Sequence, residues 1–238
     1  KSQDKSCVVY LKTIKGKGYS YSEEDKTGAW HGVSSFDKKT GEIFGRDDFT
    51  WSLAVRDEIA VEMRNNDKII TIVPGTSLGS ELDPLFSEFP SRCLDVGIAE
   101  EHAATMAAGL AKEGYHPFIS MYSTFSQRAY DEFSHDIARM NLNVTLLLDR
   151  SGLVGKDGNT HQGLYDESFI IDMPNTVSTM PSRKCEINSL LKESLNNHGV
   201  FAIRYSKEKI LKEDYKNEHI KFGQWNKFFN SKKTAIVT

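Results

Sequence analysis

Short apolar runs alternate with helix-like segments through most of this chain, and this alternation constrains the fold more than any single motif. The runs are continuously apolar and rich in β-branched residues, which is typical of strands buried on both faces. Strands are expected at residues 68–73, 93–98, 117–121, 143–148, 176–180 and 200–204. Helices are expected near residues 82–86, 100–112, 125–140, 164–171 and 182–195, after a first helix of about four turns that begins at Asp47-Asp48. The pattern predicts an α/β fold, a parallel sheet with helices on both faces.

The expected α/β unit spans residues 46–206, and the segments on either side of it have a different character. Residues 1–45 hold a strand-like run at 7–11 and then a polar, irregular stretch. Residues 207–238 are charged and irregular, and end on a strand-like run at 234–238. A lone terminal strand has no partner, and the chain opens on Lys1 rather than Met. We interpret it as the central fragment of a longer protein.

Composition excludes several classes of function. The net charge of −3 gives no electrostatic reason to bind nucleic acid or an anionic membrane. No apolar run approaches the ~18 residues that span a bilayer. Cys7, Cys93 and Cys185 are odd in number and far apart, which favours a reducing compartment over a disulfide framework. We therefore expect a cytoplasmic protein, with a targeting segment before residue 1 left open.

Polar and aromatic side chains follow four of the predicted strands. Ligands bind at the carboxyl ends of the strands in open parallel sheets, so these residues mark the expected site. They are Pro74 to Ser77 after the first strand, Glu100, Glu101 and His102 after the second, Tyr122, Phe125 and Arg128 after the third, and Asp149, Arg150, Asp157 and His161 after the fourth.

Each of these residues also has a plainer interpretation. Glu100 and Glu101 could simply offset the dipole of a helix that starts there. Phe125 could belong to the core with Arg128 at the surface, and the glycine-rich loop that carries Asp157 could be a linker. Against the first of these, Glu100 follows an apolar strand and should be partly desolvated, which suits a proton-sharing carboxyl group.

Two features of the first 45 residues likewise have both a functional and a purely structural interpretation. The run KGKGY at 15–19 could cradle a phosphate, but it does not open a helix, and a flexible turn explains it as well. His31 lies in a Trp-His-Gly sequence at 30–32. A single loop histidine is more often structural or solvated than catalytic.

Three long motifs give the chain a specific resemblance. They are DVGIAEEHAAT at 95–105, YSTFSQRAYDEFSHD at 122–136 and DRSGLVGKDGNTHQGLYD at 149–166. They resemble the central region of the 1-deoxy-D-xylulose-5-phosphate synthases, thiamine-diphosphate enzymes similar to transketolase. On this resemblance residues 1–45 are the tail of the first, diphosphate-binding domain, 46–206 the pyrimidine-binding domain, and 207–238 a linker and the first strand of the third domain.

The resemblance implies decarboxylation of pyruvate and transfer of its two-carbon acyl unit to glyceraldehyde 3-phosphate, a step toward isoprenoid, thiamine and pyridoxal precursors. It implies thiamine diphosphate, Mg²⁺ and a homodimer. It assigns catalytic roles to Glu100, His161 and His31, with Glu100 bonding the aminopyrimidine ring. It assigns cofactor contacts also to Ile98, Phe125 and Arg128. It assigns the substrate side to Tyr122, Arg150, Asp157, His161 and Lys207.

The chain departs from the family pattern at three places. Glu101 stands where the family usually has glutamine, and Gly75-Thr76 stands where it tends to have Ala-Met. Lys207 replaces an arginine that contacts phosphate in the family, and a lysine is a point charge rather than a fork.

The Gly-Asp-Gly segment that holds the family's metal and diphosphate is absent from this sequence, so we expect the Mg²⁺ ligands in the missing first domain and none in this chain. Two alternatives follow. The chain could be an inactive fragment or a non-catalytic interaction domain, or it could be another transketolase-like enzyme such as the β-type component of a 2-oxo acid dehydrogenase. The glycine-rich motif at 149–163 speaks against the second alternative.

Overall fold

The computed structural model describes residues 4–44 and 49–210, and the chain divides into two compact units, residues 1–47 and 48–238. The second unit is built on a six-stranded sheet with the order β2-β1-β3-β4-β6-β5, in which every pair of neighbours is parallel. The strands are β1 Ile69–Val73, β2 Cys93–Asp95, β3 His116–Tyr122, β4 Val144–Asp149, β5 Thr176–Thr179 and β6 Val200–Arg204. The predicted parallel α/β fold is confirmed.

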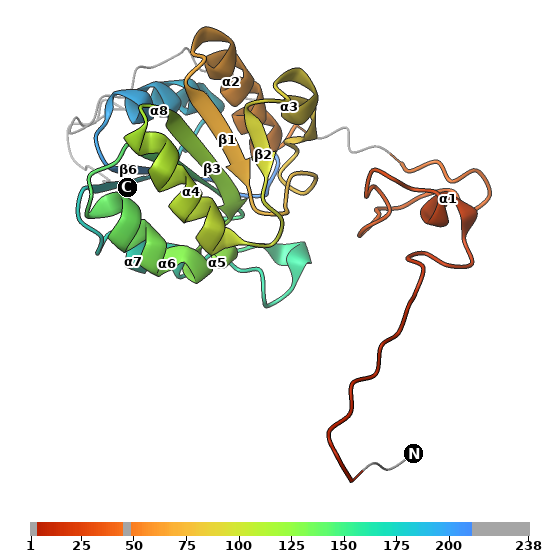
Figure 1. The fold of residues 1–238 in the computed structure, drawn as a ribbon. Helices are drawn as coiled ribbons and strands as arrows, with labels where there is room; N and C mark the ends of the chain where they lie inside the picture. Colours follow the sequence, from red (N-terminus) through yellow and green to blue (C-terminus); the bar gives the residue numbers. More distant parts are fainter. Residues whose placement is uncertain (1–3, 45–48, 211–238) are drawn as a thin grey trace, which may run out of the picture. The chain divides into compact units, whose positions relative to one another are not determined.

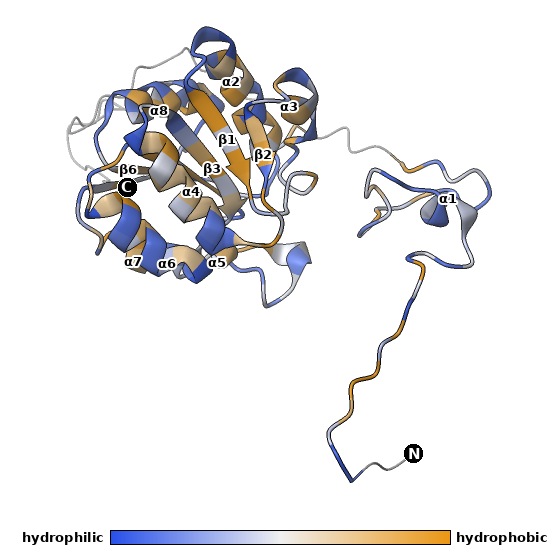
Figure 2. Ribbon diagram, in the orientation of Figure 1, coloured by the Kyte–Doolittle hydropathy of each residue, from blue (hydrophilic) through white to orange (hydrophobic). Residues whose placement is uncertain are grey.

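Helices cover both faces of this sheet, as Figure 1 shows. The principal ones are α2 Trp51–Asn65, α3 Asp83–Glu88, α4 Glu100–Lys112, α7 Asp166–Ile170 and α8 Lys184–Asn196. One apolar core joins α2, α3 and α8 to one face, and a second core joins α4 and the segment 129–138 to the other. The central strands β1 and β4 are therefore buried along their whole length, as is β3 up to its last residue, and β1 is mostly hydrophobic in Figure 2.

The order of the strands creates a switch point between β1 and β3. From β1 the chain passes to β2 on one side, then crosses back to β3 on the other side of β1. The crevice at such a reversal is where ligands bind in open α/β sheets. The register sets Val73 beside Asp95 and Tyr122 beside Asp149, so the loops after four different strands meet at one edge.

The predicted helix 125–140 is not one regular helix. It is divided into α5 Ser123–Ser126, the 3₁₀ turn η1 Gln127–Ala129, α6 Tyr130–Glu132 and the π-helix η2 Phe133–Ala138. Near its start the side chains of Ser126 and Gln127 donate to the carbonyl groups of Ser123 and Thr124, at 2.6 and 2.9 Å. Side chains that bond nearby carbonyl groups compete with the helical ladder. The sequence predicts one buried face of Ala129, Phe133, Ile137 and Met140. The first three are fully buried, but Met140 is 53% exposed.

Other boundaries also differ from the sequence-based expectation. Helix α2 begins after Thr50, whose side chain accepts from Leu53 N, so the expected cap at 47–48 is wrong. Strand β2 ends at Asp95, because Gly97 takes a positive φ of 72° that ends the extended backbone. A short 3₁₀ turn, η3 Gly155–Asp157, lies in the glycine-rich loop.

The first unit lacks the predicted strand at 7–11. That run is coil, and Val8 and Tyr10 are 98% and 85% exposed, because the described chain offers it no partner strand. The unit holds one short helix, α1 Ser20–Glu23, and an aromatic cluster of Tyr19, Trp30 and Phe36. The expected strand at 234–238 lies outside the described residues.

Within residues 4–44 and 49–210, no helix combines the length and apolar character needed to cross a membrane.

Candidate functional site

The loops after β1 and β2 are tied together at the switch-point edge. The carboxylate of Asp95 accepts hydrogen bonds from Gly75 N at 3.0 Å and from Gly97 N at 2.8 Å. Gly75 has a φ of 70°, and a Cβ there would lie 3.2 Å from the backbone of Gly97 and from Ile98. The glycine that replaces the family's alanine at position 75 thus suits the local backbone.

Glu100 is the first residue of α4 and is buried, with 2% of its surface exposed. Arg128, from η1, places Nε 3.3 Å from Glu100 Oε2 and Nη2 3.6 Å from Glu101 Oε1. Glu101 is 44% exposed, so the two acids differ in environment although they are adjacent. One cation therefore spans both carboxylates at the start of the helix.

Several buried side-chain oxygens at this edge have no hydrogen-bond partner among the described residues, among them Glu100 Oε2, Thr76 Oγ1 and Ser123 Oγ. Arg128 is near Glu100 Oε2 but does not meet hydrogen-bond geometry. Buried polar atoms in folded proteins are almost always paired. The unpaired carboxylate oxygen is therefore suited to a polar ligand that brings its own donor, such as a protonated ring nitrogen.

At the same sheet edge, an aromatic cluster combines residues from the end of β3, from α5 and from the glycine-rich loop. The rings of Tyr122 and Phe125 stack, with centroids 5.1 Å apart and planes at 17°. His161 packs edge-on against Phe125 at 5.3 Å and against Tyr122 at 6.3 Å. The structure thus brings together three predicted site residues from two distant loops, and the half-buried rings offer a platform for an aromatic ligand.

Arg150 lies over the ring of Tyr122, with Cζ 3.6 Å from the ring centroid. It is 5% exposed, and its nitrogens donate to three acceptors. These are Asp149 Oδ2 at 2.8 Å, Asp157 Oδ2 at 3.0 Å and the carbonyl oxygen of Gly79 at 3.0 Å. Burial raises the pKa of the Tyr122 phenol, while Arg150 opposes that rise.

Asp157 joins two cations. Its Oδ2 accepts from Arg150 and its Oδ1 accepts from Lys207 Nζ. Partial burial would raise the pKa of Asp157, but the hydrogen bonds from Lys207 and Arg150 outweigh it and hold that pKa below the usual range. The predicted substrate residues Tyr122, Arg150, Asp157 and Lys207 therefore form one contact network.

Two glycines allow this network to close. A Cβ on Gly79 would lie 1.9 Å from the Tyr122 hydroxyl group, and a Cβ on Gly163 would lie 2.3 Å from the Arg150 carbonyl oxygen. Gly163 also exchanges backbone hydrogen bonds with Gly152, at 2.7 and 2.9 Å, which closes the base of the loop. Both positions require a residue without a side chain.

Two predicted residues lie apart from these contacts. Ile98 is 78% exposed in the turn between β2 and α4, next to Glu100 in sequence. His31 belongs to the first unit, where its Nδ1 contacts Lys15 Nζ, so it is not among the residues that the second unit gathers. Among the described residues, no group of three or more His, Cys, Asp or Glu could hold a metal ion.

Sequence reasoning placed Asp149 at the expected site without giving it a specific role, and it did not predict the pair of Asp166 and Arg204. Asp149 is fully buried and bonds Arg150 twice. Arg204, at the end of β6, donates to both oxygens of Asp166, at 2.7 and 3.0 Å. Both pairs lie at the same strand edge. An acid directly after an entirely apolar strand was the available signal for Asp149, but its partner could not be read from spacing.

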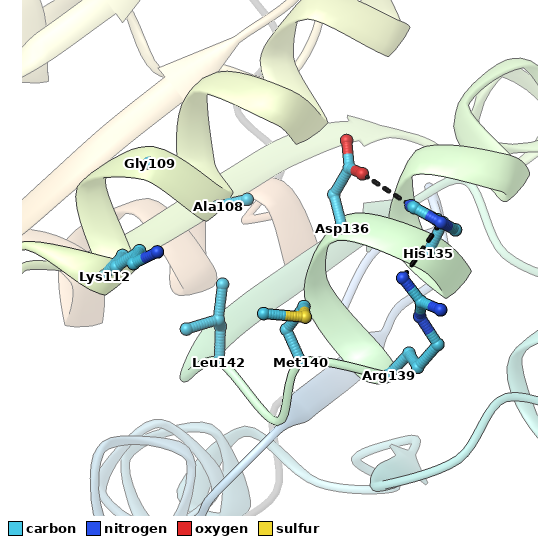
Figure 3. A pocket seen from close by; sticks show the side chains of 8 residues that line it. All are labelled: Ala108, Gly109, Lys112, His135, Asp136, Arg139, Met140 and Leu142. Atoms are coloured by element: carbon cyan, nitrogen blue, oxygen red, sulfur yellow. Dashed lines mark hydrogen bonds and ion pairs between the residues drawn. The ribbon is translucent and has the colours of Figure 1, made fainter.

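The structure also has a hollow of about 270 Å³ away from this edge, shown in Figure 3. It lies between the second half of α4 and η2, and its lining includes Lys112, Met140 and Leu142. Its polar groups satisfy one another, since His135 contacts both Asp136 and Arg139, at 3.0 and 2.9 Å. About nine residues of α4, or roughly 13 Å, separate Ala108 and Gly109 from Glu100. We therefore treat it as separate from the candidate site.

The fold is a parallel α/β domain with a buried acid and aromatic rings at its switch point. These features define a class of ligand-binding domains whose site suits a planar group that forms hydrogen bonds. Comparison with known families identifies the domain more narrowly than this class. A family model described as "Transketolase, pyrimidine binding domain" matches residues 47–212, and the chain belongs to that family.

Curated relatives show the same similarity over a greater length. The chain is 41% identical over 236 residues to proteins named 1-deoxy-D-xylulose-5-phosphate synthase from Bacillus mycoides (strain KBAB4) and Geobacillus sp. (strain WCH70). The match covers 97% of this chain but only 38% of each relative. The predicted resemblance is confirmed, and the chain corresponds to little more than a third of those proteins.

Solved structures share the fold. A split-gene transketolase described as an inactive beta4 tetramer superposes with a TM-score of 0.65 at 23% identity, over 74% of this chain and 58% of that one. Transketolase from Campylobacter jejuni gives a TM-score of 0.63 at 22% identity, over 70% of this chain and 27% of that one.

Proposed function

We propose that this chain is the pyrimidine-binding part of a thiamine-diphosphate enzyme that forms 1-deoxy-D-xylulose 5-phosphate from pyruvate and glyceraldehyde 3-phosphate. The observation that carries the proposal is the buried Glu100 oxygen without a hydrogen-bond partner, at the carboxyl edge of the sheet. The 41% identity to relatives of that name supports the choice of reaction.

The residues present fit the pyrimidine end of the cofactor. Glu100 would share a proton with a ring nitrogen, and Arg128 would keep a positive charge next to that carboxylate. Phe125 offers a half-buried ring face for stacking, and Ile98 an exposed apolar contact at the turn. Bound thiamine diphosphate would supply the electron sink for decarboxylation of a 2-oxo acid.

The other residues of the network are assigned to the substrates. His161, packed against Phe125, is the group of this unit suited to proton transfer. Arg150 and Lys207 supply positive charge for the phosphate group of the acceptor, with Tyr122 and Asp157 beside them. We assign His31 a catalytic role on the family resemblance alone.

Other parts of the proposal concern what lies outside the chain. Mg²⁺ and the diphosphate would be held by other segments of a longer polypeptide, and the active assembly would be a homodimer. Because the relatives come from bacteria, we expect the enzyme to act in the cytoplasm.

The test is formation of deoxyxylulose phosphate from the two substrates. A full-length protein that carries this chain should form the product when thiamine diphosphate and Mg²⁺ are added, and the 238-residue chain alone should not. A full-length protein without activity would refute the reaction. Activity of the isolated chain would refute our expectation that other segments hold the diphosphate.

An inactive or purely structural role is the second candidate. It concerns the 238 residues by themselves, which span 38% of the relatives' length. The same assay decides it, because a non-catalytic protein would also fail when its flanking segments are present.

A further inference from the structure

Asp149 is a buried carboxylate that never reaches the surface of the candidate site. It is the last residue of β4 and has no exposed surface. Its Oδ1 accepts from the backbone N of Arg150 at 2.7 Å, and its Oδ2 accepts from Arg150 Nη1 at 2.8 Å and from Ser52 Oγ at 3.0 Å. Two of these three hydrogen bonds hold the neighbouring residue, and the hydroxyl group of Ser80 also lies against the carboxylate.

The conformation of Arg150 needs such support. Its φ is 61°, a left-handed value that residues with a side chain rarely adopt. Its guanidinium group folds back over the strand end and lies on Tyr122. A carboxylate that bonds both the backbone N–H and the guanidinium group of the same residue fixes the backbone and the side chain together.

The other acceptors of Arg150 come from loops. Asp157 lies in the glycine-rich loop and Gly79 in the loop after β1. Asp149 alone of the three belongs to a strand, and β4 lies inside the sheet between β3 and β6. Its position is therefore set by the core rather than by a loop.

We propose that Asp149 is a positioning residue that holds Arg150 in the orientation in which the site meets an anionic substrate. The proposal rests on the proposed function for the identity of that anion, a sugar phosphate. Asp149 itself acts only through Arg150, since it is shielded from solvent.

A simpler, purely structural role for Asp149 is to link β4 to the first turn of α2 through its hydrogen bond with Ser52. A neutral side chain could make that link, whereas burying a charge is costly unless a partner compensates it. The titratable groups that interact with Asp149 are Arg150, whose positive charge compensates it, and the neutral phenols of Tyr122 and Tyr205 from the ends of β3 and β6. Burial raises the pKa of Asp149 to about 6 in spite of Arg150, so protonation should weaken the link at mildly acidic pH.

The test measures the order of the Arg150 Nε–Hε group by ¹⁵N relaxation in the 238-residue chain. At pH 7.5 we expect an order parameter of about 0.8 in the wild type and below about 0.6 in Asp149→Asn. Ser52→Ala, which removes another partner of the same carboxylate, should match the wild type. In the wild type the order parameter should fall as the pH drops through about 6, and Asp149→Asn should show no such transition.

Two results would overturn the proposal. In the first, Asp149→Asn keeps Arg150 as ordered as the wild type. In the second, Ser52→Ala loosens it equally, as a purely structural link predicts. If Asp149→Asn does not fold, the wild-type pH titration and Ser52→Ala decide, and an Arg150 that stays rigid down to pH 5 refutes the proposal. The measurement needs no cofactor, so it can succeed even if the proposed reaction is wrong.

Discussion

Arg128 Nε lies 3.3 Å from Oε2 of Glu100, a buried carboxylate oxygen that accepts no hydrogen bond. The same guanidinium group reaches the exposed Glu101. Arg128 therefore balances the charge of Glu100 without forming a hydrogen bond to this oxygen. The oxygen stays available to a ligand.

Replacing each acid in turn should therefore affect turnover to different degrees at the two neighbouring carboxylates. We expect Glu100→Gln to lower turnover of a full-length protein by roughly 10²- to 10⁴-fold, the range for loss of a proton-transferring group. Glu101→Gln should change turnover by less than about threefold, because that side chain is 44% exposed. Steady-state kinetics with circular dichroism as a folding control checks this. Equal effects of the two variants would contradict the role of Glu100.

Asp157 neutralises both cations of the proposed phosphate site. Its removal should strengthen anion binding, because Arg150 and Lys207 lose a competing carboxylate. We expect Asp157→Asn to bind sulfate about three- to tenfold more tightly in calorimetric titration, equivalent to roughly 1 kcal/mol for a partly exposed pair.

The control for this experiment is Asp172→Asn, an exposed residue with the same change of charge, which should leave sulfate binding unaltered. Weaker binding by Asp157→Asn would instead mean that Asp157 is needed to hold Arg150 and Lys207 in position for the anion.

Two glycines should respond in opposite directions to the same substitution. Gly163→Ala would place a Cβ 2.3 Å from the Arg150 carbonyl oxygen, so we expect it to lower the free energy of unfolding by about 1–3 kcal/mol. Gly109→Ala, inside α4 with nothing within 4 Å, should raise it by about 1 kcal/mol. Urea denaturation of both variants measures the two changes. A neutral Gly163→Ala would show that the loop base is loose.

His116 should make the fold sensitive to acid. Burial lowers its pKa from 6.5 to about 4, and its Nε2 lies 2.8 Å from Thr145 Oγ1. The unfolded chain therefore binds a proton more readily than the folded chain between these values. The stabilising contribution is present above pH 6.5 and is lost as the pH falls to about 4, by roughly 3 kcal/mol.

Asp149 acts in the opposite sense in an overlapping range. Its pKa is raised to about 6, so its contribution to stability is present below about pH 4 and is lost as the pH rises through 6. The effect of His116 should therefore be measured as the difference between the wild type and His116→Gln, in urea titrations at pH 7, 5.5 and 4. A difference that does not change with pH would contradict the histidine prediction.

Much of the fold could be predicted from local pattern. Mostly apolar runs such as 69–73 and 144–148 have a single stable environment, a buried parallel strand, and the spacing of the intervening segments requires helices to cross over. The run at 7–11 shows the limit of that reasoning. Its composition suits a strand, but strands need a neighbour, and the described chain gives it none.

The sequence predicted which loops form the candidate site, but it did not predict which of their side chains are in contact. Parallel strands carry their carboxyl ends to one edge, which is why Glu100, Tyr122 and Arg150 could be assigned to a common region. The domain boundaries and the individual site roles stay predictions. The irregular path of residues 123–138 could not be foreseen, because competing side-chain bonds inside a helix leave no periodic signal.

The sequence by itself determined the parallel sheet, the edge at which a ligand would bind and the family resemblance, because apolar periodicity and long motifs are local properties. Only the tertiary structure decided that Glu100 has an unpaired buried oxygen while Glu101 faces solvent, and that Asp149 holds Arg150 against Tyr122. Those facts depend on burial and on contacts between strands and loops distant in sequence. The pairing of β3 with β4 sets Tyr122 beside Asp149, and the approach of Arg128 to the start of α4 sets the surroundings of Glu100.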